Sequence, residues 1–175
     1  MIAMNSMSEK QCTRELGRIL ESSSKVAVLL RAIQLLDKTA LKRGVTCRPC
    51  KATLQENRVG YYDFQYKRVV LCCENIHTRA DVEETLIHEL VHAFDRARKG
   101  KFSSMCHLMA CGEVRASALG QCADVTPESR KKECILRDAI RSTREHCGDE
   151  AERIVRQVYN KCVKDVAPFV VGVPA

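Results

Sequence analysis

Apolar residues recur every three or four positions along most of the chain, which is the spacing of a helix buried on one side. The pattern occurs twice near the N-terminus, interrupted by Ser22–Ser24 and ended before Gly44. We therefore expect two N-terminal helices. Their apolar positions are Cys12, Leu16, Ile19 and Leu20 in the first helix, and Val26, Leu29, Leu30, Ile33 and Leu36 in the second.

The middle third of the chain contains the one stretch with a strand-like composition. Thr53–Glu56, Tyr61–Tyr66 and Lys67–Cys73 carry β-branched and aromatic residues, with a turn expected at Val59–Gly60. The preceding segment Cys47–Cys50 contains a proline and is typical of a turn. These patterns predict a small, mostly antiparallel sheet.

The helical period returns after residue 78. Thr78 and Asp81 have the spacing of a capping box, and a serine at 103 or 104 can cap the following helix. Thr126 followed by Pro127 suits an N-cap and a first helical residue. We expect helices over residues 79–99, 104–120, 127–148 and 149–164. The predicted fold class is α+β, rich in helix, with one small sheet.

The expected helix 79–99 contains His88-Glu89-Leu90-Val91-His92. Residues four apart lie on one helix face, so both imidazoles can bind one Zn²⁺ at roughly 2.0–2.1 Å. Glu89 follows the first histidine and can act as a general base toward water. The uncharged residues around it suit a buried active-site helix. The pattern predicts a zinc-dependent metalloendopeptidase with one catalytic Zn²⁺, bound by His88 and His92, and with Glu89 as catalytic residue.

A catalytic zinc needs a third protein ligand. Glu113 lies twenty-one residues after His92, on the next expected helix, and His107 lies fifteen after it. The two are about 120° apart on a helical wheel, so they do not both ligate. We favour Glu113 and keep His107 as the alternative. An ion pair with an arginine would also explain Glu113, and a hydrogen-bonded core histidine would explain His107.

Substrate binding leaves less specific signals. In zinc peptidases an exposed edge strand near the metal helix pairs with an extended substrate. Val69, Val70 and Leu71 are candidates for that strand, and ordinary sheet core explains them equally well. Arg115 could contact the substrate or charge that develops during the reaction, whereas a salt bridge explains it more simply.

Eleven cysteines are present among 175 residues, and they are scattered along the chain. A second zinc site at Cys47, Cys50, Cys72 and Cys73 is one alternative, and a redox-active Cys47–Cys50 pair is another. We favour disulfides, with about ten cysteines bonded and one left unpaired. Cys134, Cys147 and Cys162 are candidates to crosslink a helical hairpin. The first residues lack the features of a secretory signal or a matrix presequence, although such bonds indicate an oxidising compartment.

The formal net charge is +7, spread over several segments, and the densest basic run is Arg96–Lys101. This run could contact an anionic membrane surface or an acidic substrate, although a solvated helix end explains it more simply. Few aromatic residues accompany the basic ones, so no nucleic acid is expected as a partner. No apolar run approaches the length of a transmembrane helix.

Several motifs together resemble one family, the mitochondrial inner membrane metalloproteases that process ATP synthase subunit six and assist assembly of the synthase membrane sector. The similarity runs from about Cys47 to Phe169. The motifs that carry it are Cys47-x-x-Cys50, Gly60-Tyr61-Tyr62-Asp63, Val70-Leu71-Cys72-x-x-Asn75, His88 to Asp95, His107 to Ala116, and Cys162 with Asp165 and Pro168-Phe169.

The resemblance implies a single zincin-like metallopeptidase domain over residues 1–175. Its N-terminal helices would occupy residues 1–44, and its catalytic core and disulfide-linked C-terminal helices residues 45–169. It further implies residence in the mitochondrial intermembrane space, import without a cleaved presequence, and peripheral association with the inner membrane. Protein substrates would include the precursor of ATP synthase subunit six.

Two alternatives remain beside this function. A non-catalytic chaperone or assembly factor could use the same disulfide-rich scaffold, and a cytosolic zinc protease could keep its cysteines reduced. The cleavage site, the disulfide pairing and the oligomeric state do not follow from the sequence.

Overall fold

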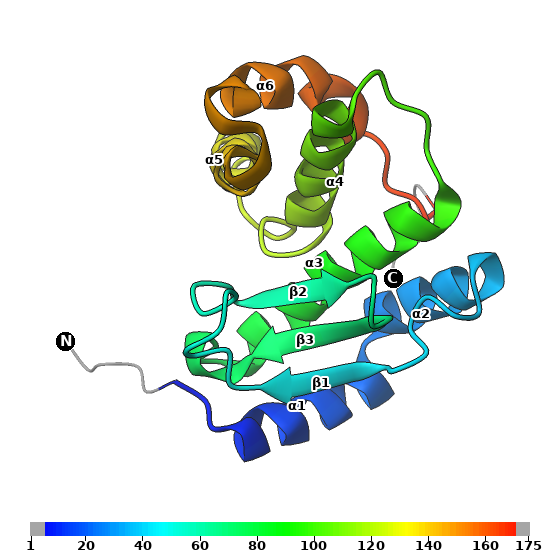
Figure 1. Cartoon of the computed structure of the whole chain (residues 1–175), viewed down its shortest axis with the longest axis vertical. Helices are drawn as coiled ribbons and strands as arrows, with labels where there is room; N and C mark the ends of the chain where they lie inside the picture. The colour runs from blue at the N-terminus through cyan, green and yellow to red at the C-terminus, as the bar shows by residue number, and fades with distance from the viewer. Residues whose placement is uncertain (1–5, 171–175) are drawn as a thin grey trace. The chain divides into compact units, whose positions relative to one another are not determined.

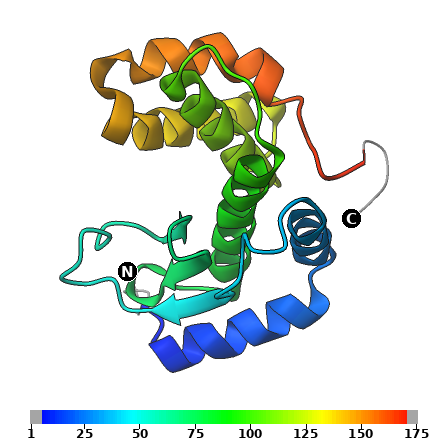
Figure 2. The same ribbon diagram turned by 45° about the vertical axis from the view of Figure 1, so that its right-hand side comes forward.

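The structure is a computed structural model that describes residues 6–170, and these residues form two compact units divided between Ala97 and Arg98. Figure 1 labels the elements, and Figure 2 shows the same ribbon turned by 45°. The first unit contains α1 (Glu9–Ser22), α2 (Ser24–Leu36), β1 (Val45–Arg48), β2 (Gly60–Asp63), β3 (Arg68–Cys72), the 3-10 turn η1 (Cys73–Asn75) and most of α3 (Arg79–Arg98). The second contains α4 (Met105–Leu119), α5 (Glu128–Cys147), the 3-10 turn η2 (Gly148–Glu150) and α6 (Ala151–Cys162).

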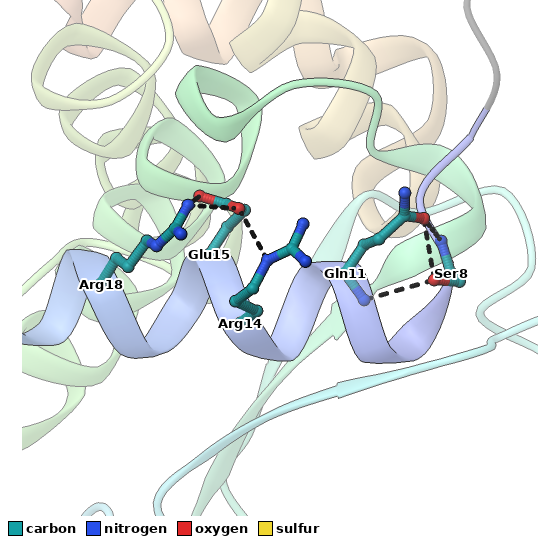
Figure 3. A network of polar contacts seen from close by, with 5 residues as sticks. All are labelled: Ser8, Gln11, Arg14, Glu15 and Arg18. Carbon is teal, nitrogen blue, oxygen red and sulfur yellow. Dashed lines mark hydrogen bonds and ion pairs between the residues drawn. The ribbon is translucent and has the colours of Figure 1, made fainter.

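The first helix begins at the capping motif drawn in Figure 3. The Ser8 side chain accepts a hydrogen bond from the Gln11 backbone N–H, and the Gln11 side chain accepts one from the Ser8 N–H. Glu15 then lies between Arg14 and Arg18, whose guanidinium groups both bind its carboxylate. The buried side of α1 carries Cys12, which forms a disulfide with Cys47 of β1. This bond ties the helix to the sheet.

The sheet has the strand order β1-β3-β2, with β1 parallel to β3 and β2 antiparallel to it. The expectation of a mostly antiparallel sheet is therefore wrong, because one of its two pairings is parallel. The first strand, β1, lies at Val45–Arg48. Its last two residues fall within Cys47–Cys50, where a turn was expected. The prediction that the sheet lies in the middle third is confirmed for β2 and β3, whereas β1 lies earlier in the chain. The α+β class is confirmed.

Thr53–Glu56 does not form the expected strand. Its backbone folds into successive turns, in which the Thr53 N–H donates to the Cys50 carbonyl and the Glu56 N–H donates to the Thr53 carbonyl. The Thr53 hydroxyl also donates to the Cys50 carbonyl at 2.6 Å. A threonine that satisfies backbone groups locally competes with strand pairing. The Cys50–Cys72 disulfide anchors these turns to β3.

The second unit is a bundle in which α4, α5 and α6 lie side by side (Figures 1 and 2). Its core combines Val114, Ile135, Ala139 and Val155, all fully buried. Gly148, with φ of 56°, ends α5 as its position predicted. Pro127 is the N-cap of α5, one position later than the expected Thr126.

Three disulfides crosslink this bundle: Cys106–Cys147, Cys111–Cys162 and Cys122–Cys134. The expected crosslink among Cys134, Cys147 and Cys162 is wrong, because each of them bonds to a cysteine in or just after α4. Each disulfide of this unit therefore joins α4, or the turn just after it, to α5 or α6. The preference for disulfides is confirmed, with ten cysteines bonded and Cys73 free and buried.

Candidate metal centre

The helix α3 begins where the sequence predicted. The Asp81 backbone N–H donates to the Thr78 hydroxyl at 3.1 Å, and the Thr78 N–H donates back to the Asp81 carboxylate at 2.9 Å. The capping box is therefore confirmed. Beyond it, one side of α3 is buried, and its residues Val82, Leu86, Leu90, Val91 and Ala93 are each 0% exposed. This burial fixes the helix's rotation, and with it the direction of the histidines.

His88 and His92 lie one turn apart on α3, both half-buried. Their Nε2 atoms are 3.1 Å apart and their ring centroids 4.8 Å apart. Two nitrogens bound tetrahedrally to one zinc at 2.0–2.1 Å would be separated by about 3.4 Å. The observed separation is within a few tenths of an ångström of that value, so the pair fits a shared Zn²⁺.

Glu89 is buried, with 7% of its surface exposed, and faces β2. A Cβ built on Gly60, the first residue of β2, would lie 2.7 Å from the Thr85 methyl carbon and 3.4 Å from Glu89 Cγ. The absent side chain at Gly60 therefore allows α3 to pack directly against this strand. The backbone of β2 and the Glu89 side chain are neighbours as a result.

The expectation of an edge strand at Val69, Val70 and Leu71 is wrong. These residues belong to β3, the central strand, and each is 1% exposed or less, so the alternative of sheet core describes them. Strand composition predicted burial but could not give the strand order. The strand β2, whose Gly60 lies against α3, is an edge strand of the sheet.

The two candidates for the third ligand belong to α4, in the second unit. The His107 ring Nδ1 is 2.8 Å from the hydroxyl of Ser104, the N-cap residue of α4. His107 thus takes part in the start of the helix. Glu113 lies two turns further along, half-buried. The ligand role of either residue remains a prediction.

Arg115 is 1% exposed and binds the segment that follows α6. Its Nη1 lies 2.7 Å from a carboxylate oxygen of Asp165, and its Nη2 donates to the Ala167 carbonyl at 2.6 Å. The salt-bridge explanation therefore describes Arg115 in this structure. Burial works to raise the pKa of Asp165, but hydrogen bonds and charges from Arg98 and Arg115 outweigh it and hold that pKa below its usual value.

The basic run at Arg96–Lys101 is partly used within the protein. The Arg96 guanidinium lies 4.8 Å from the centre of the Phe64 ring, and Arg98 binds Asp165 at 2.7 Å. Lys99 and Lys101 are exposed. Between residues 6 and 170, no helix has both the length and the apolar character needed to cross a membrane.

The second zinc site considered at Cys47, Cys50, Cys72 and Cys73 does not form, because the first three are in disulfides. The redox pair Cys47–Cys50 is excluded in the same way, since each bonds to a different partner. Gly60 was expected only in a turn and as part of a family motif, and Asp165 only as part of a family motif. A glycine directly before a Tyr-Tyr pair is weak evidence of close packing between a strand and a helix. The ion pairs of Asp165 join residues 50 or more positions apart, so sequence spacing does not reveal them.

Comparisons with known proteins identify relatives along nearly the whole chain. A mitochondrial inner membrane protease ATP23 homolog of Danio rerio is 35% identical over 91% of this chain and 66% of its own length. Mitochondrial inner membrane proteases atp23 of Schizosaccharomyces pombe and Aspergillus clavatus are 32% and 30% identical, over 94% and 91% of this chain and 94% and 72% of theirs. No solved structure matches the chain significantly.

This chain spans about two thirds of the zebrafish relative, and more of the two fungal ones. Residues 10–170 match the peptidase M76 family, a range that contains α3 with both histidines, Glu89, and the three helices of the second unit. The resemblance found in the sequence motifs is thereby confirmed, and the chain belongs to the peptidase M76 family.

Proposed function

We propose that this protein is a zinc-dependent metalloendopeptidase of the mitochondrial intermembrane space. The observation that carries the proposal is the 3.1 Å separation between the Nε2 atoms of His88 and His92 on α3. Glu89, the residue after His88, is a buried carboxylate on the same helix. Imidazole nitrogen is a common zinc ligand, and three protein ligands leave one position open in catalytic sites. Membership of a peptidase family agrees with this chemistry.

We assign the third ligand to Glu113. It is a half-buried carboxylate on α4, twenty-one residues after His92, and a carboxylate completes the two-histidine set of many zinc peptidases. His107 is the weaker candidate because its ring already contacts the N-cap serine of its own helix. The ligand set is then His88, His92 and Glu113.

Glu89 is the proposed general base. Once bound, Zn²⁺ would supply Lewis-acid polarisation of the scissile carbonyl and would acidify water. The Glu89 carboxylate accepts the proton of the attacking water and delivers it to the leaving amine, so that it serves first as base and then as acid. Its burial against β2 keeps it in one orientation and limits competing water.

The substrate backbone is proposed to pair with β2. Within the described three-stranded sheet, β2 is bonded to β3 on one side, and its other side faces away from the sheet. We propose that an extended peptide added there runs near Glu89, because a Cβ on Gly60 would lie 3.4 Å from Glu89 Cγ. Main-chain pairing of this kind gives affinity without strict side-chain selection. It suits an endopeptidase that accepts unfolded propeptides.

The disulfides and the names of the relatives support the proposed compartment. Five disulfides form and persist in oxidising compartments, which favours the intermembrane space over the cytosol and the matrix. The relatives are named mitochondrial inner membrane proteases. We propose peripheral association with that membrane, with exposed lysines such as Lys99 and Lys101 available to anionic headgroups. The proposed substrate is the ATP synthase subunit six precursor, with a further role in synthase assembly.

The test replaces Glu89 by Gln and measures cleavage of that precursor, or of a peptide library, together with zinc content. We expect cleavage to fall about 10²- to 10⁴-fold while one zinc per chain remains bound. Glu83→Gln, a half-buried carboxylate on the same helix, is the control and should cleave normally. Unchanged cleavage by the Glu89 variant would refute the role of that residue. A wild-type protein that cleaves nothing but supports synthase assembly would instead establish the non-catalytic assembly factor.

A further inference from the structure

The first unit presents large apolar side chains to solvent at one end of its sheet. Two of them, Leu35 and Leu36, lie at the end of α2 and are 78% and 50% exposed. Two others, Phe64 and Tyr66, lie in the turn between β2 and β3 and are 49% and 52% exposed. Single exposed apolar residues are ordinary on a protein surface, whereas a group of them marks an interaction site.

Hydrogen bonds hold these two segments together. The Arg43 backbone N–H, seven residues beyond α2, donates to the Lys67 carbonyl of the turn at 2.9 Å. The Tyr62 hydroxyl on β2 donates to the Ala40 carbonyl at 3.0 Å. Figure 1 shows the connection from α2 to β1 and the turn from β2 to β3 at the same end of the sheet, on the right. The two segments therefore belong to one surface.

This surface, which we call the hairpin end (residues 35–43 and 63–68), is basic as well as apolar. It contains five basic residues and two acidic ones. One of the acids, Asp63, pairs with Arg68 at 3.5 Å. The fully exposed basic side chains are those of Lys38, Lys42 and Arg43. The hairpin end therefore carries a net positive charge that faces solvent.

The two aromatic rings of the hairpin end already contact arginines. The guanidinium carbons of Arg43 and Arg68 lie 5.3 Å and 5.1 Å from the centre of the Tyr66 ring, and that of Arg96 lies 4.8 Å from the centre of the Phe64 ring. Cation–π contacts attract each ring to a positive charge. The side chains are thus ordered before they meet a partner, which reduces the entropy lost on binding.

We propose that the hairpin end docks the protein on an anionic lipid membrane. Aromatic rings favour the level of the lipid headgroups, and exposed leucines favour the boundary with the acyl chains. Lysine and arginine are attracted to anionic headgroups. An acidic protein would match the charge, but leucine is under-represented among the residues that dominate protein–protein binding.

The inference rests on the membrane association in the proposed function and names the surface responsible for it. The turn of the hairpin end directly follows β2, the strand proposed to bind substrate. Docking through this turn would hold that strand close to the membrane surface. A segment of a membrane protein that emerges from the bilayer would then reach it without a long extended tether.

The test measures binding of the oxidised, full-length protein to sedimented vesicles of phosphatidylcholine alone, or of equal parts of phosphatidylcholine and phosphatidylglycerol. Wild type should prefer the anionic vesicles. Lys38→Gln/Lys42→Gln should weaken that binding about 25-fold, because each basic residue near such a surface contributes about fivefold. Leu35→Gln should weaken it about tenfold, since it removes a leucine that leaves water on docking. These side chains are exposed, so the variants should remain folded.

Arg48→Gln/Lys51→Gln is the matched control. It removes two positive charges from exposed positions of the same unit, at the other end of β1 from Arg43. It should bind nearly as wild type does. Lys99→Gln/Lys101→Gln removes the exposed lysines of the second unit, and it should lose less affinity than the double lysine variant of the hairpin end.

Phe64→Trp reports the contact directly, because the chain contains no tryptophan. Its emission should shift to the blue on addition of anionic vesicles and stay unchanged with phosphatidylcholine alone. Unchanged emission with anionic vesicles would overturn the proposal, as would wild-type affinity in Lys38→Gln/Lys42→Gln or an equal loss in the matched control. Wild type that binds neither kind of vesicle would also overturn it, and would leave an acidic protein as the occupant.

Failure of the proposed peptidase is separable from failure of this inference. Cleavage of a soluble peptide needs no vesicle, and vesicle binding needs no cleavage. A protein that binds anionic vesicles through the hairpin end but cleaves nothing would refute the peptidase alone. A protein that cleaves the peptide but ignores the vesicles would refute the docking surface alone.

Discussion

Replacing Gly60 by alanine tests how closely α3 packs on the sheet. The new Cβ would lie 2.7 Å from the Thr85 methyl carbon and 3.1 Å from the Val70 carbonyl oxygen. Carbon atoms in good contact lie about 3.5–4.0 Å apart, so one element must move by roughly 1 Å. Movement of β2 would disturb its pairing with β3, where Gly60 lies opposite Leu71. Movement of α3 would displace its buried apolar side. Overpacking of this kind costs about 1–3 kcal/mol.

The assay is urea denaturation of the oxidised protein, followed by circular dichroism, with the free energy of unfolding as readout. Gly60→Ala should lose about 1–3 kcal/mol. Gly60→Ala/Thr85→Ser should recover most of that loss, because serine lacks the methyl carbon that the new Cβ meets. Gly17→Ala is the control: nothing lies within 4 Å of its added Cβ, and it lies inside α1. It should gain about 0.5–1 kcal/mol. Wild-type stability of Gly60→Ala, or no recovery in the double variant, would refute the packing argument.

Three further predictions concern the disulfides and Asp165. Alkylation of unfolded, unreduced protein should label one thiol per chain, at Cys73, and label at any other cysteine would contradict the pairing. Cys111→Ala/Cys162→Ala should lower the free energy of unfolding by about 4 kcal/mol, because this disulfide closes a loop of 51 residues. Cys122→Ala/Cys134→Ala should lower it by about 3 kcal/mol, because its loop spans 12 residues. A larger loss for the second variant in denaturation experiments would contradict the loop-closure argument. The depressed pKa of Asp165 means that its ion pairs add stability above its ordinary value of 3.8, and that this stability is lost as pH falls through the lower folded value. Asp165→Asn should therefore be less stable than wild type at pH 7, with a difference that shrinks in acid, and a difference independent of pH would contradict the assignment.

Local signals in the sequence predicted the helices and the placement of His88 and His92 on one helix face well. The start of α3 follows from Thr78 and Asp81, whose side chains bond to backbone groups within four residues. The separation of His88 and His92 follows from the helical repeat alone. Both features depend on interactions between residues close in sequence, so they can be deduced without knowledge of the fold.

Features that depend on distant residues could not be deduced in the same way. The central position of β3 results from pairing with β1, about twenty-four residues earlier, and β-branched composition does not show which strands flank it. The disulfide partners of Cys147 and Cys162 lie 41 and 51 residues away on α4. Sequence spacing suggested a hairpin crosslink because α5 and α6 are consecutive, whereas the core brings α4 against both.

The ligand shell of the bound metal tests the central claim most directly. X-ray absorption at the zinc edge of oxidised, full-length protein loaded with one equivalent of Zn²⁺ reports which atoms surround the ion. The account predicts two imidazole nitrogens with oxygen ligands and no sulfur, and loss of one imidazole in His92→Ala. A shell that contains sulfur, or one unchanged in both His88→Ala and His92→Ala, would contradict it.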